Sequence, residues 1–400
     1  MLRVLELFAG IGACSKALEN LNIPHEIVDA VEIDKYAIAA FNAIHNTNFE
    51  PQDIREWDKD IKVDFIMHGS PCQDFSIAGR QAGGDKDSGT RSSLMYETLR
   101  IVEKLHPKYV IWENVKNILS RRHVHNWNAY VEYMEELGYE NYCQVLNAKD
   151  YGIPQNRERV FTVSIRLDVP FATLFQFPEP TPLNKRLKDV LETEVDEKYF
   201  ISENMMNYFM GVNQKPSKFP RQQRFLANIN RKNQDWANSI TTAPGQRPTD
   251  NFIIQPFVAA SRGRGDKNKQ QLEPNFSGVS NTLTSVQKDN YVIIKTANKI
   301  GYDLATNGDG VDLSYPKSKT RRGRVGHGVC KTLPTSNTQG VMDSYRIRKL
   351  TPRECYHLMG FDDTSFDKAS KVISNTQLYK TAGNSIVVPV LEAILNNLVL

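Results

Sequence analysis

Cys72 lies in a polar loop, residues 69–76, that directly follows the apolar run Asp64–His68. A thiol on a loop at the carboxyl end of a strand is well placed for nucleophilic attack, provided that its surroundings favour the thiolate. A single cysteine is more often an inert buried side chain. The flanking residues Pro71, Gln73 and Ser76 are not typical of a core, so Cys72 is a candidate nucleophile.

A glycine-rich turn, Phe8-Ala9-Gly10-Ile11-Gly12, follows the first apolar run of the chain. Glycines at such a turn let a ligand approach the backbone where a Cβ would block it. Ser15 stands where the dinucleotide-binding pattern has its third glycine, which disfavours NAD and FAD. Glu32 ends the next strand, where an acidic side chain can bind ribose hydroxyls. The combination predicts a nucleoside ligand without a pyrophosphate, of which S-adenosylmethionine is the common example.

Two further groups of charged residues stand at expected strand ends. Glu113 closes the run that begins at Tyr109, and the segment Gln155–Arg159 places alternate cationic side chains on one face. Each of these alone would equally suit an ordinary salt-bridged strand end. Residues 79–92 are rich in glycine and charge, which predicts a mobile lid over a substrate.

Strand and helix patterns alternate over the first 165 residues. Apolar, β-branched runs predict strands at Val4–Phe8, Glu26–Ile33, Asp64–His68, Tyr109–Glu113, Tyr142–Leu146 and Val160–Ile165. Helical patterns lie between them, at Ser15–Leu21, Lys35–Ile44, Leu94–Leu105 and Trp127–Leu137. This order predicts an α/β fold with a doubly wound, mostly parallel sheet. Ligands of such sheets bind at the carboxyl ends of the strands.

The pattern changes at the proline-rich stretch 177–182. The chain beyond it is irregular, with short strand-like runs, which predicts a second, smaller, irregular β-rich domain. Helical signals return at Thr351–Glu354, and Asn384–Leu400 is apolar enough to pack back on the first domain. We therefore expect a catalytic and cofactor-binding domain over 1–180, a second domain over 185–340, and a returning segment over 345–400.

Charge is distributed unevenly along the 400 residues, although the net charge is only +4. Residues 201–345 hold 20 Lys and Arg against 10 Asp and Glu, together with 25 Asn and Gln. Basic and amide side chains contact the phosphates and base edges of DNA, so this segment is a candidate nucleic-acid reader. A polar surface domain rich in loops explains the composition equally well.

Several classes of protein are disfavoured. No apolar run reaches the ~18 residues that cross a bilayer, and the N-terminus lacks the layout of a signal peptide. Five scattered cysteines without a CxxC pair predict neither a disulfide framework nor a zinc site. We expect a cytoplasmic protein that binds no metal and no membrane.

Taken together, the motifs resemble those of the cytosine-5 DNA methyltransferases of prokaryotic or phage type. The resemblance spans nearly the whole chain and rests on six motifs in order: Phe8-Ala9-Gly10-Ile11-Gly12, Pro71-Cys72-Gln73, Glu113-Asn114-Val115, Gln155-Asn156-Arg157-Glu158-Arg159, Arg348-Lys349-Leu350-Thr351-Pro352-Arg353-Glu354 and Gly383-Asn384-Ser385. The chain departs from the pattern at Ala13, where many members have a third glycine, and alanine is small enough that we expect little effect.

The resemblance implies a Rossmann-like fold that depends on S-adenosylmethionine and releases S-adenosylhomocysteine. It makes Cys72 the nucleophile, Glu113 the acid that binds cytosine, and Arg157 and Arg159 its positively charged support. It assigns cofactor binding to Phe8, Ala9, Gly10, Gly12, Glu32, Asp53, Ile54, Pro71, Asn384 and Ser385. It makes 185–340 the target recognition domain.

The implied reaction is methylation at carbon 5 of a flipped-out cytosine in a specific sequence of double-stranded DNA, through a covalent Cys72 adduct. We expect a monomer, with any cognate restriction endonuclease acting separately. The closest alternative keeps the chemistry but takes transfer RNA as substrate, and the long basic insert argues against it. A catalytically silent DNA-binding module conflicts with the intact Cys72, Glu113 and Arg159, and a Rossmann oxidoreductase conflicts with the missing third glycine.

Overall fold

The fold is known from a computed structural model. It describes residues 1–71, 90–185, 187–199, 258–262, 271–275, 290–298, 301–306, 308–315, 318, 320–335, 338–343 and 346–398. Cys72, most of the expected lid 79–92 and the expected strand Phe252–Gln255 lie outside these residues. No helix among the described residues is long and apolar enough to cross a membrane.

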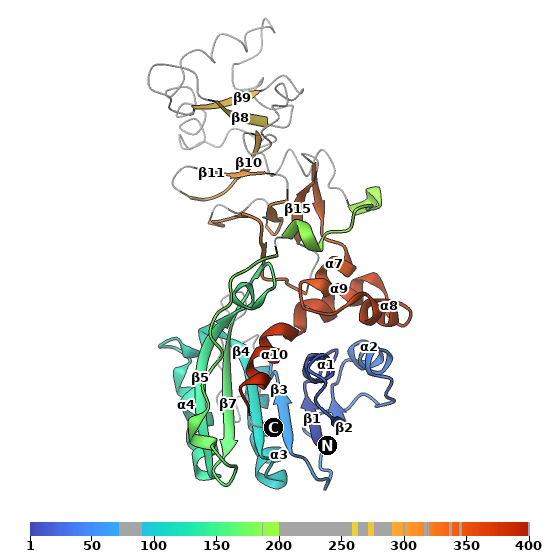
Figure 1. The fold of residues 1–400 in the computed structure, drawn as a ribbon, viewed down its shortest axis with the longest axis vertical. Helices are drawn as coiled ribbons and strands as arrows, with labels where there is room; N and C mark the ends of the chain where they lie inside the picture. Colours follow the sequence, from blue (N-terminus) through green and yellow to red (C-terminus); the bar gives the residue numbers. More distant parts are fainter. Residues whose placement is uncertain are drawn as a thin grey trace, which may run out of the picture. The chain divides into compact units, whose positions relative to one another are not determined.

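A six-stranded sheet with the order β2-β1-β3-β4-β7-β5 forms the centre of the N-terminal part (Figure 1). Its strands are β1 (Leu2–Leu7), β2 (His25–Val31), β3 (Phe65–His68), β4 (Tyr109–Val115), β5 (Tyr139–Asn147) and β7 (Glu158–Arg166). β2, β1, β3 and β4 pair in parallel, whereas β7 runs antiparallel to both β4 and β5. The prediction of an α/β fold with a mostly parallel sheet is confirmed, and each of its six strands overlaps an expected one.

Helices cover both faces of this sheet because the strands are apolar on both faces. Leu5, Ile66 and Val110 are in register on one face, where they share a core with α3 (Met95–Leu105) and α4 (Val124–Glu136). Side chains alternate along a strand, so Glu6 points to the opposite face, where it binds Ser15 of α1 (Ala13–Asn20). On that face, α1 contacts α10 (Val388–Asn396).

The remaining helices of unit 1 are α2 (Lys35–His45), α7 (Pro352–His357), α8 (Asp363–Ser370) and α9 (Asn375–Asn384). Ion pairs connect helices from the two ends of the chain. Lys16 of α1 lies 2.8 Å from Asp362, the N-cap of α8, and Lys380 of α9 lies 2.6 Å from Asp34, the N-cap of α2. Each of the two aspartates therefore has two roles: its carboxylate accepts a hydrogen bond from a backbone N–H of its helix and also pairs with a lysine.

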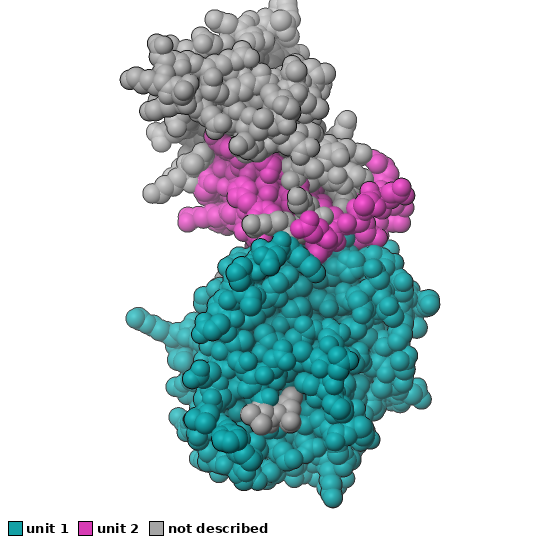
Figure 2. Space-filling model, in the orientation of Figure 1, with its two compact units in different colours: residues 1–185, 332–336, 352–400 teal, residues 186–331, 337–351 magenta. Residues whose placement is uncertain are grey.

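The chain divides into two compact units, which Figure 2 shows in different colours. Unit 1 comprises residues 1–185, 332–336 and 352–400, and unit 2 comprises 186–331 and 337–351. The short segment 332–336 belongs to unit 1, although both of its sequence neighbours belong to unit 2. The C-terminal helices complete unit 1.

Unit 2 contains two small sheets of four strands, ordered β11-β10-β8-β9 and β13-β12-β15-β16. The strands are β8 (Val258–Arg262), β9 (Gln271–Asn275), β10 (Asn290–Lys295), β11 (Tyr302–Ala305), β12 (Gly310–Asp312), β13 (Val325–Gly326), β15 (Gln339–Asp343) and β16 (Arg346–Lys349). The prediction of a second, smaller β-rich domain is confirmed.

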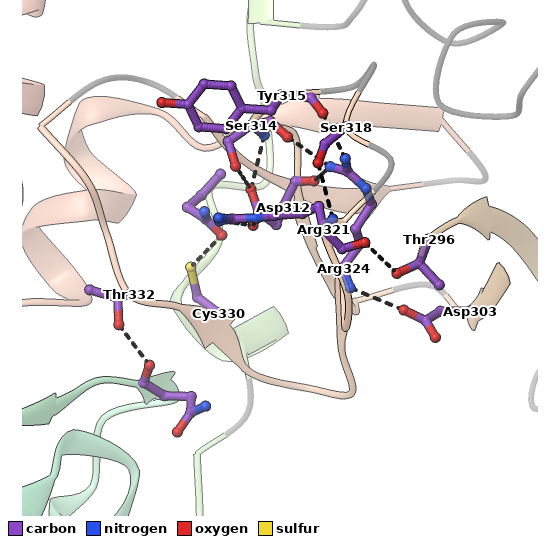
Figure 3. Close-up of polar contacts among 12 residues, drawn as sticks. Thr296, Asp303, Asp312, Ser314, Tyr315, Ser318, Arg321, Arg324, Cys330 and Thr332 are labelled. Atoms are coloured by element: carbon purple, nitrogen blue, oxygen red, sulfur yellow. Dashed lines mark hydrogen bonds and ion pairs between the residues drawn. The ribbon is translucent and has the colours of Figure 1, made fainter. Parts of the chain in front are cut away.

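A buried arginine organises the turn that follows β12 (Figure 3). Arg324 is 2% exposed, and its guanidinium donates to the carbonyl oxygens of Asp312, Ser314 and Tyr315 at 2.8–2.9 Å. Burial lowers the pKa of Arg324, but guanidinium groups stay charged in proteins. Arg321 pairs with the Asp312 carboxylate beside it. A fixed cation thus satisfies three backbone carbonyl groups of this turn.

The Asp362 carboxylate predicts a pH-dependent contribution to stability. Burial acts to raise its pKa, but hydrogen bonds from Lys16 and Ser365 dominate and lower the pKa to about 2. We expect Asp362→Asn to keep the helix cap but to destabilise the protein by up to about 1 kcal/mol, since the Asp362 side chain is half exposed and its ion pair is screened. The difference from the unsubstituted protein should be constant above about pH 4 and should vanish as the pH falls toward 2.

Urea unfolding at a series of pH values measures this difference, and Asp362→Ala, which also loses the cap, is the comparison. A difference that grows as the pH falls would contradict the assignment.

Candidate active site

A cavity of about 1080 Å³ opens at the carboxyl ends of β1, β2, β3 and β4 in unit 1. Ten of the predicted site residues line it: Phe8, Gly10, Glu32, Asp53, Ile54, Pro71, Glu113, Arg157, Arg159 and Asn384. Ala9, Gly12 and Ser385 are buried and do not line it. Residues from distant parts of the sequence therefore share one hollow, as the parallel strands require.

The glycine-rich turn has a left-handed backbone at Phe8, Gly10 and Gly12, with φ of 54°, 57° and 78°. A Cβ on Gly12 would fall 2.2 Å from His45 Nε2, so only glycine fits there. A Cβ on Gly10 would meet no atom within 4 Å, so that the backbone borders open space. Phe8 holds a conformation that costs a non-glycine residue of order 1–3 kcal/mol, as is frequent at ligand sites.

Glu32 lies across the turn from Gly10. Its carboxylate accepts hydrogen bonds from the backbone N–H of Gly10 (3.1 Å) and of Asp34 (2.8 Å). Burial outweighs these bonds and raises the pKa of Glu32. The carboxylate is fixed by backbone donors at the cavity wall, where hydroxyl groups of a ligand can reach it.

The loop that contains Asp53 and Ile54 forms another wall of the cavity. Hydrogen bonds from Arg55 lower the pKa of Asp53, which is therefore an ionised acceptor. Arg100 of α3 donates to the carbonyl oxygen of Ile54 (3.0 Å) and ties this loop to the helix. Sequence patterns did not single out Arg100, because its partner is a backbone atom 46 residues away.

Buried polar side chains hold the residues that precede Cys72. Trp112 Nε1 donates to Ser70 Oγ (3.0 Å), and the Trp112 ring stacks on His68 with centroids 5.7 Å apart. His68 Nε2 lies 3.2 Å from the Tyr130 hydroxyl. Burial lowers the pKa of His68 to about 3, so the ring is neutral near pH 7. The approach to the candidate nucleophile is thus anchored from β4 and α4.

Glu113 and Arg159 form the charged centre of the cavity. Arg159 Nε lies 3.0 Å from Glu113 Oε1, and both side chains are less than a fifth exposed. This oxygen is buried and accepts no hydrogen bond from the described residues, so the contact is an ion pair without hydrogen-bond alignment. A buried acceptor that lacks a donor is costly. A ligand that donates to it would remove this cost.

Arg157, two residues away, makes different contacts. It is 4% exposed, and its guanidinium donates to the carbonyl oxygens of Ser385 (2.8 Å), Gly383 (3.3 Å) and Leu333 (3.4 Å). Gln155 extends this set, since it accepts from the Leu333 N–H and donates to the Leu358 carbonyl. The two side chains join the sheet to segment 332–336 and to the C-terminal helices.

Glu6 and Ser15 form a buried polar pair, not predicted from the sequence, behind the glycine-rich turn. Glu6 is 3% exposed and accepts from both the backbone N–H and the hydroxyl of Ser15. Burial raises the pKa of Glu6. An acid inside an apolar strand was the signal for Glu6 in the sequence.

Among the residues that the structure describes, no group of three or more His, Cys, Asp or Glu side chains could hold a metal ion.

The carbonyl contacts of Arg157 predict a mainly structural effect of its substitution. Arg157→Lys should lower the free energy of unfolding by about 2 kcal/mol, because a single compact ammonium cannot reach the carbonyl groups of two segments that the two terminal nitrogens of the guanidinium contact. Arg159→Lys, two residues further on, should change it by less than about 1 kcal/mol, because the ammonium keeps the charge that faces its one carboxylate partner. Denaturant unfolding measures both variants, and equal losses would contradict the structural role of Arg157.

Comparison with known proteins places this chain in a family. The family model for C-5 cytosine-specific DNA methylases matches residues 2–400. A type II methyltransferase, M2.ScrFI of Lactococcus lactis subsp. cremoris, is 31% identical over 100% of this chain and 99% of its own. The orphan methyltransferase M.SPRI of Bacillus phage SPR is also 31% identical, over 100% of this chain and 97% of its own.

Solved structures agree at the level of the fold. A putative DNA modification methyltransferase encoded within an E. coli prophage superposes with a TM-score of 0.56 at 20% identity, covering 99% of this chain and 98% of that one. A Spodoptera frugiperda DNMT2 variant superposes with a TM-score of 0.55 at 19% identity, covering 99% of both chains. With a family model that matches almost every residue, the chain belongs to the C-5 cytosine-specific DNA methylases.

Proposed function

We propose that this protein transfers a methyl group from S-adenosylmethionine to carbon 5 of a flipped-out cytosine in a specific sequence of duplex DNA. The observation that carries the proposal is the shared cavity. Glu32 and the glycine-rich turn line one part of it, and the Glu113–Arg159 pair lines another, beside the residues that lead to Cys72. Such a cavity suits a reaction between a nucleoside cofactor and a second, planar ligand.

The residues of the cavity fit the cofactor. Glu32 offers fixed carboxylate oxygens to ribose hydroxyls, and the Gly10 backbone borders space that a side chain would fill. Asp53 and Ile54 offer an ionised acceptor and an apolar contact to the adenine, and Asn384 lines the cavity from α9. S-adenosylmethionine, when bound, supplies an electrophilic methyl group and leaves as S-adenosylhomocysteine.

The protein side chains must activate the cytosine, because its carbon 5 is a weak nucleophile. Addition of the Cys72 thiolate to carbon 6 would push electron density onto carbon 5. Glu113 would hydrogen-bond ring nitrogen 3 and stabilise its protonation, and Arg159 would donate to the exocyclic oxygen. Carbon 5 would then take the methyl group, and transfer of the carbon 5 proton to a water or a side chain, with expulsion of the Cys72 thiolate, would release 5-methylcytosine. Arg157 would support this centre by holding the chain segments behind it.

The target carbon is inaccessible in a stacked duplex, so the proposal includes base flipping, at a cost of a few kcal/mol. We infer that residues 185–340 read the DNA sequence, since they carry most of the excess positive charge. We further infer that the protein acts in the cytoplasm. We expect it to be a monomer, because each methylation event handles one base. A separately acting restriction endonuclease would suit the type II name of the Lactococcus relative, whereas the phage relative is named an orphan.

A methyl-transfer assay with tritiated S-adenosylmethionine tests the proposal. We expect label to enter duplex DNA and not transfer RNA, and sequencing of the labelled positions to give one target motif. Cys72→Ala should lower transfer by at least about 1000-fold, because no other group replaces the thiolate. Its cofactor affinity, measured by calorimetry, should be retained.

Cys143→Ala is the matched control and should remain active, since Cys143 lies on β5 and does not line the cavity. Retained turnover by Cys72→Ala would exclude the covalent mechanism. Label in transfer RNA alone would favour the alternative substrate.

The recognition role of residues 185–340 has its own test. Exchange of this segment for that of the Lactococcus relative should move the methylated motif to the relative's motif, because base contacts define the sequence preference. Methylation of the original motif by the active chimaera would place recognition elsewhere. Restriction digests of methylated plasmid DNA measure the outcome.

A further inference from the structure

Unit 1 has a basic surface that the proposed chemistry does not use. The basic loop, residues 116–125, begins where β4 ends and includes the short 3-10 helix Lys116–Leu119 and the first residues of α4. Lys116, Arg121, Arg122 and His125 are exposed on it. The sequence contains no Asp or Glu from Asn114 to Val131, so this stretch carries a local excess of positive charge.

The position of the loop links it to the active-site cavity. Lys116 follows Glu113 by three residues, and its ammonium lies 3.1 Å from the carboxylate of Glu158, the neighbour of Arg159. Both partners are about half exposed, and such surface pairs contribute at most about 1 kcal/mol. Another anion can therefore replace Glu158 as the partner of Lys116 at little cost.

The loop is also held in a defined conformation. Ile118 is fully buried and His123 is 1% exposed, so the loop alternates buried anchors with exposed cations. Backbone bonds from Ser120 to Asn117 and from both His123 and Val124 to Ser120 (2.9–3.0 Å) close its turns. Cations on a fixed loop lose less conformational entropy on binding than cations on a flexible one.

The electrostatics at the end of the loop favour an anion. α4 has 13 residues, no acidic side chain in its first turn and no side-chain cap at its N-terminus. The partial positive charge of this helix end adds to that of Arg121 and Arg122 beside it. Several fixed cations on one surface complement a ligand that carries several anionic groups, and a run of phosphates is such a ligand.

We propose that the basic loop binds the phosphate backbone of the DNA duplex next to the target cytosine. The inference rests on the proposed function, and it adds a sequence-independent contact on the catalytic unit, apart from the basic recognition segment. The loop then contributes affinity and orientation, and sequence preference remains with other residues.

The test uses the full-length protein and a fluorescein-labelled 30-base-pair duplex of arbitrary sequence, because the contact does not depend on sequence. Fluorescence anisotropy gives Kd at several NaCl concentrations between 50 and 200 mM. For Arg121→Ala/Arg122→Ala we expect about tenfold weaker binding at 50 mM and a salt slope smaller by about 2, one unit per lost phosphate contact. KM for DNA should rise while kcat at saturating DNA is unchanged.

Two control variants separate charge from position. Arg121→Lys/Arg122→Lys keeps the charge and should retain the salt slope. Lys104→Ala/Lys108→Ala removes two exposed cations near the beginning of β4, at the end of this strand that lies away from the basic loop. This variant should bind DNA like the unsubstituted protein. An unchanged melting temperature shows that the exposed substitutions preserve the fold.

Three results would overturn the inference. An active enzyme whose salt slope and Kd are unaffected by Arg121→Ala/Arg122→Ala would reject the loop contact and leave the proposed function intact. A larger effect on an RNA duplex of the same length would reject DNA as the partner. Failure of the unsubstituted protein to bind and methylate duplex DNA would reject the proposed function and the inference together.

Discussion

The carbonyl contacts of the buried Arg157 guanidinium are the interaction on which the rest of unit 1 depends. Arg157 donates to backbone oxygens that lie 176, 226 and 228 residues further along the chain. An unpaired buried charge is strongly destabilising, and both terminal nitrogens of Arg157 donate to these backbone oxygens. These contacts hold segment 332–336 and the end of α9 against the sheet. Gly383 shows how close this packing is, since a Cβ there would fall 2.4 Å from the Pro334 oxygen.

The same packing explains why the cavity has walls from both ends of the chain. Asn384 lines the cavity between Gly383 and Ser385, the two residues whose carbonyl groups Arg157 binds. Ion pairs between helix caps and lysines, Lys16 with Asp362 and Lys380 with Asp34, fix the neighbouring C-terminal helices. In our proposal, a chain that separates catalytic motifs by a long recognition insert needs such contacts, because the insert imposes no geometry on the residues that follow it.

The two arginines differ in their contacts and in their place along the chain, since Arg157 precedes β7 and Arg159 lies within it. Arg157 is buried against backbone carbonyls, whereas Arg159 reaches the carboxylate of Glu113 at the cavity wall. The resemblance in sequence predicted both arginines to be positively charged support for a bound cytosine. The described side-chain contacts of Arg157 are with backbone carbonyl groups, which in our proposal gives it a positioning role, whereas Arg159 has a carboxylate partner that a ligand can share.

The sequence by itself determined the fold class and ten residues of the cavity lining. Periodicity reveals strands, parallel strands bring their carboxyl ends to one edge, and residues that follow those ends must meet there. Glu32, Glu113 and the glycine-rich turn were predictable for this reason. Only the tertiary structure decided the contacts of Arg157, the neutral state of His68 and the tie between Arg100 and Ile54. These depend on burial and on backbone partners from distant segments, and no local spacing encodes which distant atom will fill a given site.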